Sequence, residues 1–180
     1  MKHFPRGKWM VMISGRGSNL QNVLEMSEDL ECQWVISSRK RAQGLRKARR
    51  FGCQTLILPE GPLQSGSLAD ILKRRKVSKV FLLGFMRILP ADFLELGLAR
   101  IFNLHPSLLP LFPGKDAFER SLEAAAPLGV TIHEVNERVD EGQAWVKHKI
   151  RNSKKKVEEM KMYLALAERA AVSEFLRKIK

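Results

Sequence analysis

The chain has 180 residues, of which 44% are hydrophobic and 28% are charged, which is ordinary for a soluble globular protein and predicts a single domain over 1–180. Its 32 Lys and Arg residues exceed its 19 Asp and Glu residues, and the net charge of +13 favours anionic partners. No apolar run reaches 18 residues and the N-terminus lacks a signal peptide's apolar region, so we expect no membrane span. Cys32 and Cys53 lack metal-ligand spacing, and we expect both to be reduced thiols of a cytoplasmic protein.

Strand and helix signals alternate through the first two thirds of the chain. Short apolar runs predict strands at 9–13, 33–37, 54–58, 79–84 and 99–104. Helical spacing predicts a first helix that starts near Leu20 and further helices over 43–51, 68–75 and 90–98. This alternation indicates a Rossmann-like α/β fold, with a mostly parallel sheet and helices on both of its faces.

The pattern changes after residue 115. A helix is predicted over 118–125, and two alternating segments, 129–135 and 143–150, predict an antiparallel C-terminal strand pair. A long closing helix is predicted over 155–179. Its apolar stripe consists of Val157, Met160, Leu164, Ala167, Ala171 and Phe175.

The first strand ends in a glycine loop, residues 14–19, before the first helix. Gly15 and Gly17 let backbone amides and a helix N-terminus face an anion, although a helix cap or a structural turn explains the same residues. Leu20 occupies the third glycine position of the dinucleotide fingerprint, and the second strand has no acidic residue at its end. These two features argue against NAD as the ligand of this loop and favour a phosphate or another anion.

The segment 99–114 carries the strongest chemical signal. Pro106 keeps His105 extended at the end of a strand, and Asn103, two residues earlier, points to the same face. Open α/β sheets bind ligands at such carboxyl ends, although a satisfied histidine before a rigid turn is the plainer interpretation. Asp140 lies in a glycine-containing turn. If this turn folded over His105, its carboxylate would orient the imidazole and raise the histidine pKa.

Basic residues gather in three places. These clusters are Arg39–Arg50, Lys73–Lys76 and Lys154–Lys156. No aromatic residues alternate with them, as they do in proteins that bind single-stranded nucleic acid. A solvated basic surface is therefore favoured, and RNA binding remains an open alternative.

Four motifs, in this order, resemble phosphoribosylglycinamide (glycinamide ribonucleotide) formyltransferase over most of the chain. They are Ser14-Gly15-Arg16-Gly17-Ser18-Asn19-Leu20-Gln21, Gly84-Phe85-Met86-Arg87-Ile88-Leu89, Asn103-Leu104-His105-Pro106-Ser107-Leu108-Leu109-Pro110 and Asp140-Glu141-Gly142. The resemblance implies the formyltransferase fold. It also implies transfer of a formyl group from 10-formyltetrahydrofolate to the amine of glycinamide ribonucleotide in purine biosynthesis, without a metal.

The same resemblance assigns residues to roles. Asn103, His105 and Asp140 would be catalytic, and Glu168 would hold the glycinamide end of the substrate. The substrate phosphate would be held by Gly15, Arg16, Gly17, Ser18 and Asn19. The folate would be held by the backbone of Phe85, Met86, Arg87, Ile88 and Leu89. An amide that donates to the oxyanion of a tetrahedral carbon, beside a proton-carrying imidazole, agrees with these roles.

The chain departs from the family pattern at five places. These are the short segment 61–67, residues 115–117, Gln143-Ala144-Trp145, Arg169 and the missing C-terminal extension. They leave two alternatives open: a formyltransferase for another amine, such as a sugar nucleotide, or an inactive RNA- or polyanion-binding protein on the same scaffold. We expect small-molecule substrates, no membrane, and a monomer or homodimer.

Overall fold

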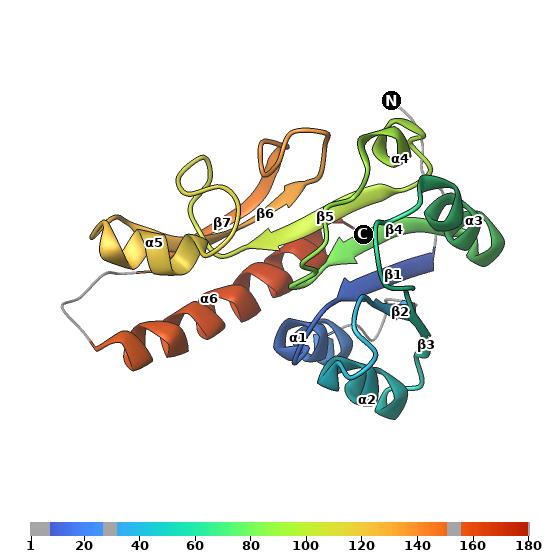
Figure 1. Ribbon diagram of the computed structural model, residues 1–180. Helices are drawn as coiled ribbons and strands as arrows, with labels where there is room; N and C mark the ends of the chain where they lie inside the picture. The colour runs from blue at the N-terminus through green and yellow to red at the C-terminus, as the bar shows by residue number, and fades with distance from the viewer. Residues whose placement is uncertain (1–7, 27–31, 151–155, 180) are drawn as a thin grey trace. The chain divides into compact units, whose positions relative to one another are not determined.

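The computed structural model describes residues 8–26, 32–150 and 156–179 (Figure 1). Its contacts divide the chain into two compact units, 1–102 and 103–180. A single domain over 1–180 stays a prediction. The N-terminal segment 1–6 and two residues of the third basic cluster, Lys154 and Lys155, lie outside the described residues.

The first unit alternates strands and helices. Its elements are β1 (Lys8–Ile13), α1 (Ser18–Met26), β2 (Cys32–Ser37), α2 (Gln43–Arg50), β3 (Gln54–Ile57), α3 (Ser65–Arg75), β4 (Val77–Leu82) and α4 (Ala91–Glu95). β1 pairs in parallel with β2 on one side and with β4 on the other, and β3 pairs in parallel with β2. The predicted parallel sheet is therefore confirmed.

Helices cover both faces of this sheet because alternate residues of β1 point in opposite directions. Met10 and Met12 line a small apolar cavity together with residues of α3 and α4, including Leu72 and Phe93. On the other face, a Cβ placed on Gly44 of α2 would lie 2.4 Å from Ile13 Cδ1, so α2 packs directly on β1. Two covered faces explain why β1 reads as a continuous apolar run rather than an alternating one.

Two helices differ from their predicted bounds. α3 begins at Ser65 instead of residue 68, because its first turn consists of small residues that carry no hydrophobic period. α4 ends at Glu95 instead of residue 98. Gly97 follows with a positive φ of 57°, a conformation that ends a helix readily.

β5 (Arg100–His105) crosses from the first unit into the second. The second unit continues with α5 (Ala117–Glu123), β6 (Leu128–Glu134), β7 (Ala144–Ile150) and α6 (Val157–Lys178). β6 and β7 pair antiparallel, with Val130 opposite His148 and Ile132 opposite Val146. The predicted antiparallel C-terminal pair is confirmed.

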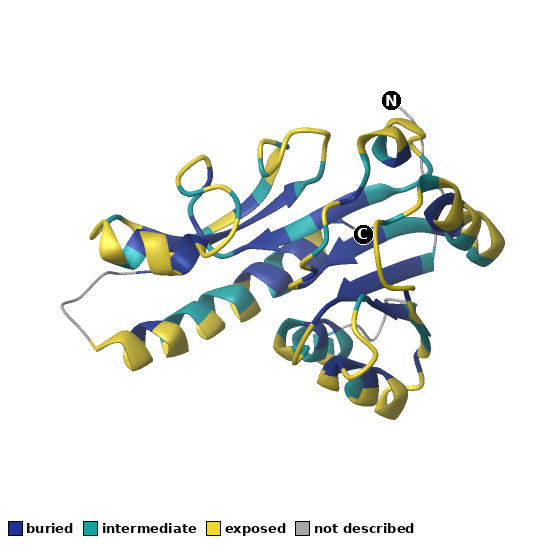
Figure 2. Cartoon of the chain, in the orientation of Figure 1, coloured by how far each residue is buried: buried dark blue, intermediate teal, exposed yellow. Residues whose placement is uncertain are grey.

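The core of the second unit lies where α5 and α6 meet the β6–β7 pair. Phe118, Leu128, Ile150 and Met160 form a buried cluster, and the inner stripe of α6 is dark blue or teal in Figure 2. Val157 was predicted to join this stripe, but it is 48% exposed because it lies in the first turn of the helix.

Two further observations bear on the sequence-based expectations. Cys53 is a buried free thiol, whereas the side chain of Cys32 lies outside the described part of the structure. Within the described ranges, no helix combines the length and the apolar character that crossing a bilayer requires.

Candidate functional site

The second unit brings Asn103, His105 and Asp140 together. His105, the last residue of β5, is buried, and Asn103 is half-buried two residues earlier. His105 Nδ1 lies 3.2 Å from Asp140 Oδ2, and Asn103 Nδ2 lies 3.5 Å from Asp140 Oδ1. One carboxylate thus contacts both polar side chains at the carboxyl end of the strand.

Asp140 lies in the turn between β6 and β7, and this turn places its carboxylate beside the end of β5. Asp140 has a left-handed φ of 59°, which aspartate tolerates better than most residues. A Cβ on Gly142 would lie 1.6 Å from the Glu134 carbonyl oxygen, so only glycine fits where the turn closes. Gly114 N donates a 2.8 Å hydrogen bond to Asp140 Oδ2 and ties the turn to the loop after β5.

His133 completes the cluster, and its part in it was missed at the sequence level. Its Nε2 lies 3.3 Å from Asp140 Oδ1 and 3.3 Å from Asn103 Nδ2. Its Nδ1 donates to the Glu134 carbonyl at 3.1 Å, which fixes the ring with Nε2 toward Asp140 and Asn103. The available signal was an imidazole in the middle of an apolar strand, but a sequence does not show which strand residues meet in space.

Burial and hydrogen bonding shift two acidities in this cluster. Burial lowers the pKa of His105 below its ordinary value, and this effect outweighs the hydrogen bond to Phe112 and the charge of Asp140, which both raise it. Asp140 acts in the direction expected from the sequence, but the net pKa of His105 lies below the ordinary value rather than above it. Burial raises the pKa of Asp140, yet hydrogen bonds from His133 and Gly114 and the charges of the two histidines bring it below its ordinary value.

A rigid loop holds the other edge of the His105 ring. His105 Nε2 donates to the Phe112 carbonyl at 2.9 Å. Ser107 Oγ donates to the Leu111 carbonyl at 2.6 Å, and Thr131 Oγ1 of β6 donates to the Ser107 carbonyl at 2.8 Å. The proline-rich segment is therefore a tightly bonded turn around the imidazole, as its composition predicted.

The predicted phosphate loop lies in the first unit, between β1 and α1. Gly15, Arg16 and Ser18 are exposed, whereas Gly17 and Asn19 are half-buried. Gly44 N of α2 donates to the Gly15 carbonyl at 3.1 Å, and Gly17 has a left-handed φ of 69°. Exposed glycine backbone at a helix N-terminus suits an anion, and the binding role stays a prediction.

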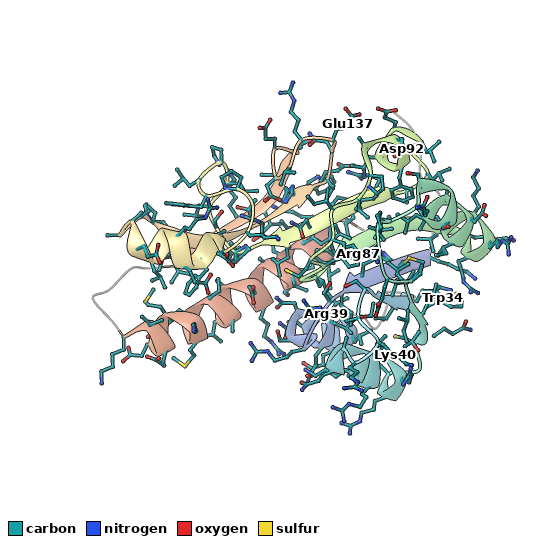
Figure 3. The ribbon with its side chains drawn as sticks, viewed as in Figure 1. Trp34, Arg39, Lys40, Arg87, Asp92 and Glu137 are labelled. Carbon is teal, nitrogen blue, oxygen red and sulfur yellow. The ribbon has the colours of Figure 1, made fainter. Side chains whose placement is uncertain are left out.

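The predicted folate segment, 85–89, lies beside this loop. Met86 N donates to Ser14 Oγ at 2.8 Å, and Ser14 N donates to the Gly84 carbonyl at 3.1 Å. Phe85 and Leu89 are buried, whereas Met86 and Ile88 are 59% and 77% exposed. The guanidinium of Arg87, labelled in Figure 3, donates to the Pro59 carbonyl at 2.9 Å and to that of Gly61.

The remaining predicted residue, Glu168, is half-buried in α6, and its role stays a prediction. The described residues contain no group of three or more His, Cys, Asp or Glu side chains placed to hold a metal ion. The chemistry available from the described side chains is proton transfer and hydrogen bonding to a developing negative charge.

Comparison with known proteins gives consistent matches. Residues 7–176 match the profile of the family described as "Formyl transferase". Phosphoribosylglycinamide formyltransferase of Haemophilus influenzae is 32% identical over 153 residues, which are 79% of this chain and 72% of that protein. The crystal structure of phosphoribosylglycinamide formyltransferase from Anaplasma phagocytophilum superposes with a TM-score of 0.90 at 31% identity, covering 96% of this chain and 86% of that one.

The chain is also similar to larger proteins. The trifunctional purine biosynthetic protein adenosine-3 of Drosophila pseudoobscura pseudoobscura is 37% identical over 150 residues, which are 77% of this chain. The chain spans 11% of that relative's length. Its similarity to the trifunctional protein therefore concerns one part of that protein.

Proposed function

Because the chain belongs to the formyl transferase family, we propose that it transfers a formyl group from 10-formyltetrahydrofolate to the amine of glycinamide ribonucleotide, a step of de novo purine biosynthesis. The observation that carries this proposal is the contact of one half-buried carboxylate, Asp140, with Asn103 and His105. Formyl transfer to an amine needs a donor to an oxyanion and a carrier for one proton. These three residues have the required chemistry.

Asn103 supplies the donor. Of its two Nδ2 hydrogens, one points to Asp140 Oδ1 at 3.5 Å and fixes the direction of the amide, and we assign the other to the formyl oxygen. A preorganised donor stabilises the charge that develops on the formyl oxygen when the amine attacks, because it need not reorient during the reaction. Asn103 is thus assigned to the oxyanion.

His105 carries the proton. Its lowered pKa keeps the ring neutral at pH 7, so it can accept a proton from the attacking amine and return one to the departing folate nitrogen. Asp140, whose pKa is also lowered, stays ionised and stabilises the imidazolium. For this step the ring proton lies on Nδ1 toward Asp140, and Nε2 leaves the Phe112 carbonyl to accept the proton of the amine.

The first unit supplies the binding segments. We assign the substrate phosphate to the exposed loop Gly15–Asn19 and the folate to the backbone of 85–89, which Ser14 links directly. Glu168 is assigned to the glycinamide end of the substrate. We further infer that the protein acts in the cytoplasm on these two small molecules, as a monomer or homodimer.

The test is formyl transfer by the purified protein from 10-formyl-5,8-dideazafolate to glycinamide ribonucleotide, followed by the absorbance of the deformylated product. Asn103→Ala should lower kcat by about 10²–10³ because one oxyanion donor is lost. His105→Ala should also be severely impaired. His148→Ala is the matched control, since His148 lies on β7 and pairs with Glu174 of α6 rather than with Asp140.

Each outcome has a distinct meaning. Parental rates in both Asn103→Ala and His105→Ala would overturn the assigned site. A parent that binds the folate analogue but forms no product with glycinamide ribonucleotide would overturn the acceptor and favour another amine. A parent that binds no folate analogue would overturn the proposed function as a whole.

A further inference from the structure

The first unit carries a basic surface that the proposed function does not use. It consists of the exposed cations of α2 and of the C-terminal end of α3 with its cap, which we call the basic rim: Arg46, Arg49, Arg50, Lys73, Arg74 and Lys76. After Gln43, every exposed position of α2 is an arginine. A surface helix normally mixes charges of both signs on its solvated face.

The basic rim lies at the amino ends of the parallel strands. α2 ends at Arg50 and β3 begins at Gln54, while α3 ends at Arg75 and β4 begins at Val77. The loop Gly15–Asn19 follows the opposite end of β1, a strand of six residues that spans about 20 Å. Binding at the basic rim therefore leaves the predicted phosphate loop accessible.

Two contacts fix the ends of α2 and α3 to the sheet edge formed by β2 and β3. Arg49 Nε donates to Thr55 Oγ1 at 3.2 Å on the face covered by α2. On the other face, the Arg75 guanidinium stacks 3.6 Å from the ring centroid of Trp34, the residue labelled in Figure 3. The α2 and α3 cations thus approach the same edge from its two faces.

The helix dipole accounts for only part of this charge. A helix C-terminus carries about half a negative charge and attracts one cation. The last turn of α2 has three cations, and the end of α3, including its cap Lys76, has four. Like charges three and four residues apart, such as Arg46 with Arg49 and Arg50, destabilise a helix.

Asp70, one turn before Lys73 and Arg74 in α3, is the single acidic residue of the two helices that carry the basic rim. Residues 32–59 contain no Asp or Glu, and no ion pair among the described residues involves a cation of the basic rim. Nearby, at the start of β4, burial and then the charge of Arg100 lower the pKa of Lys79. The ends of α2 and α3 therefore carry more positive charge than the one acidic residue of these two helices can offset.

We propose that the basic rim binds the phosphate backbone of single-stranded nucleic acid. Arginine and lysine side chains bind backbone phosphates, and each contact gains free energy by releasing counterions. The two groups of cations lie on opposite faces of a sheet edge, so a flexible single strand can reach both, whereas a stiff duplex reaches one at a time. This inference is independent of the proposed formyl transfer.

The test uses a fluorescein-labelled 20-nucleotide uridine RNA and fluorescence anisotropy between 50 and 300 mM KCl. Two variants each remove three cations of the rim: R46Q/R49Q/R50Q and K73Q/R74Q/K76Q. A control of equal charge, K115Q/K161Q/R177Q, removes three exposed cations of the second unit. Circular dichroism and the rate of formyl transfer, which should not change, report whether each variant is folded.

Each rim variant should bind the RNA at least about tenfold more weakly at 50 mM KCl. The slope of log K against log salt should fall by about 2, since each single-strand contact contributes about 0.7. The control should stay within about twofold of the parent. Equal losses in the control and the rim variants would overturn the proposal. So would equal affinity for a 20-base-pair RNA duplex, or displacement of the RNA by phosphatidylserine vesicles but not by unlabelled RNA.

Discussion

At the residue scale, Asp140 connects every polar group of the candidate site. It accepts a hydrogen bond from the Gly114 amide and lies within 3.5 Å of two histidine rings and one amide. Such a carboxylate is stabilised as the anion, which is the form that can hold an imidazolium. Its low pKa argues that it positions and charges His105 and does not itself carry the proton.

The lowered pKa values of His105 and Asp140 predict how the stability of the fold depends on pH. The folded pKa of His105 lies below 6.5 and that of Asp140 lies below 3.8, so the unfolded chain binds more protons than the folded chain below each value. Stability is therefore lost as the pH falls from about 6.5 through the folded pKa of His105, and again below about 3.8 through that of Asp140. Urea unfolding at pH 7 and pH 5 should give a lower free energy of unfolding at pH 5.

The variant His105→Gln should remove much of that difference between pH 7 and pH 5. His148→Gln, which removes a partly exposed histidine of β7, should keep it. Equal free energies at both pH values in the parent would contradict the buried, neutral state of His105.

At the element scale, the contact between α2 and the loop before α1 depends on two glycines, Gly17 and Gly44. A Cβ on Gly17 would lie 2.8 Å from Gly44 Cα, in a backbone with a φ of 69°. Gly17→Ala should therefore cost at least about 1–2 kcal/mol of unfolding free energy in urea. Gly15→Ala is the control, because nothing lies within 4 Å of its added Cβ. Equal losses in both variants would show that the loop does not pack on α2 as described.

α6 offers a second matched pair two residues apart. Met160 is 2% exposed in the core cluster of the second unit, whereas Met162 is 54% exposed. Met160→Ala should cost about 2–5 kcal/mol because it leaves a cavity, and Met162→Ala should cost less than about 0.5 kcal/mol. Urea unfolding followed by circular dichroism measures both. Similar values for the two variants would place the apolar stripe of α6 on the wrong face.

Most elements could be predicted from the sequence because each rests on a local pattern. The apolar runs of β1 and β4 and the proline after His105 are visible within a few residues. The cluster around Asp140 depends on contacts between segments up to 37 residues apart. The family motifs made Asp140 a candidate, but no local pattern revealed His133 or the carbonyl of Phe112. The net pKa of His105 also depends on burial, which a sequence does not show.

At the scale of the whole molecule, one strand belongs to both units. Ile101 and Phe102 of β5 are buried in the first unit, and Asn103 and His105 follow directly in the second. Because β5 is one continuous strand, unfolding of one unit removes the packing that holds one half of β5 in place. We predict a single cooperative unfolding transition, as the single-domain prediction requires.

Hydrogen exchange in increasing urea measures this cooperativity. Peptides from β1 and from β6 should lose protection at the same urea concentration. Loss of protection in β6 at a clearly lower concentration would show that the units unfold separately, and would contradict the prediction of a single domain.

The left-handed backbone at Asp140 limits how this site can change during evolution. Only glycine, asparagine and aspartate adopt that conformation at little cost, so the backbone admits few replacements. Both permitted alternatives abolish the negative charge beside His105. A descendant in which glycine or asparagine replaced Asp140 would therefore keep the turn between β6 and β7. It would lose the carboxylate beside His105, and so be folded but inactive.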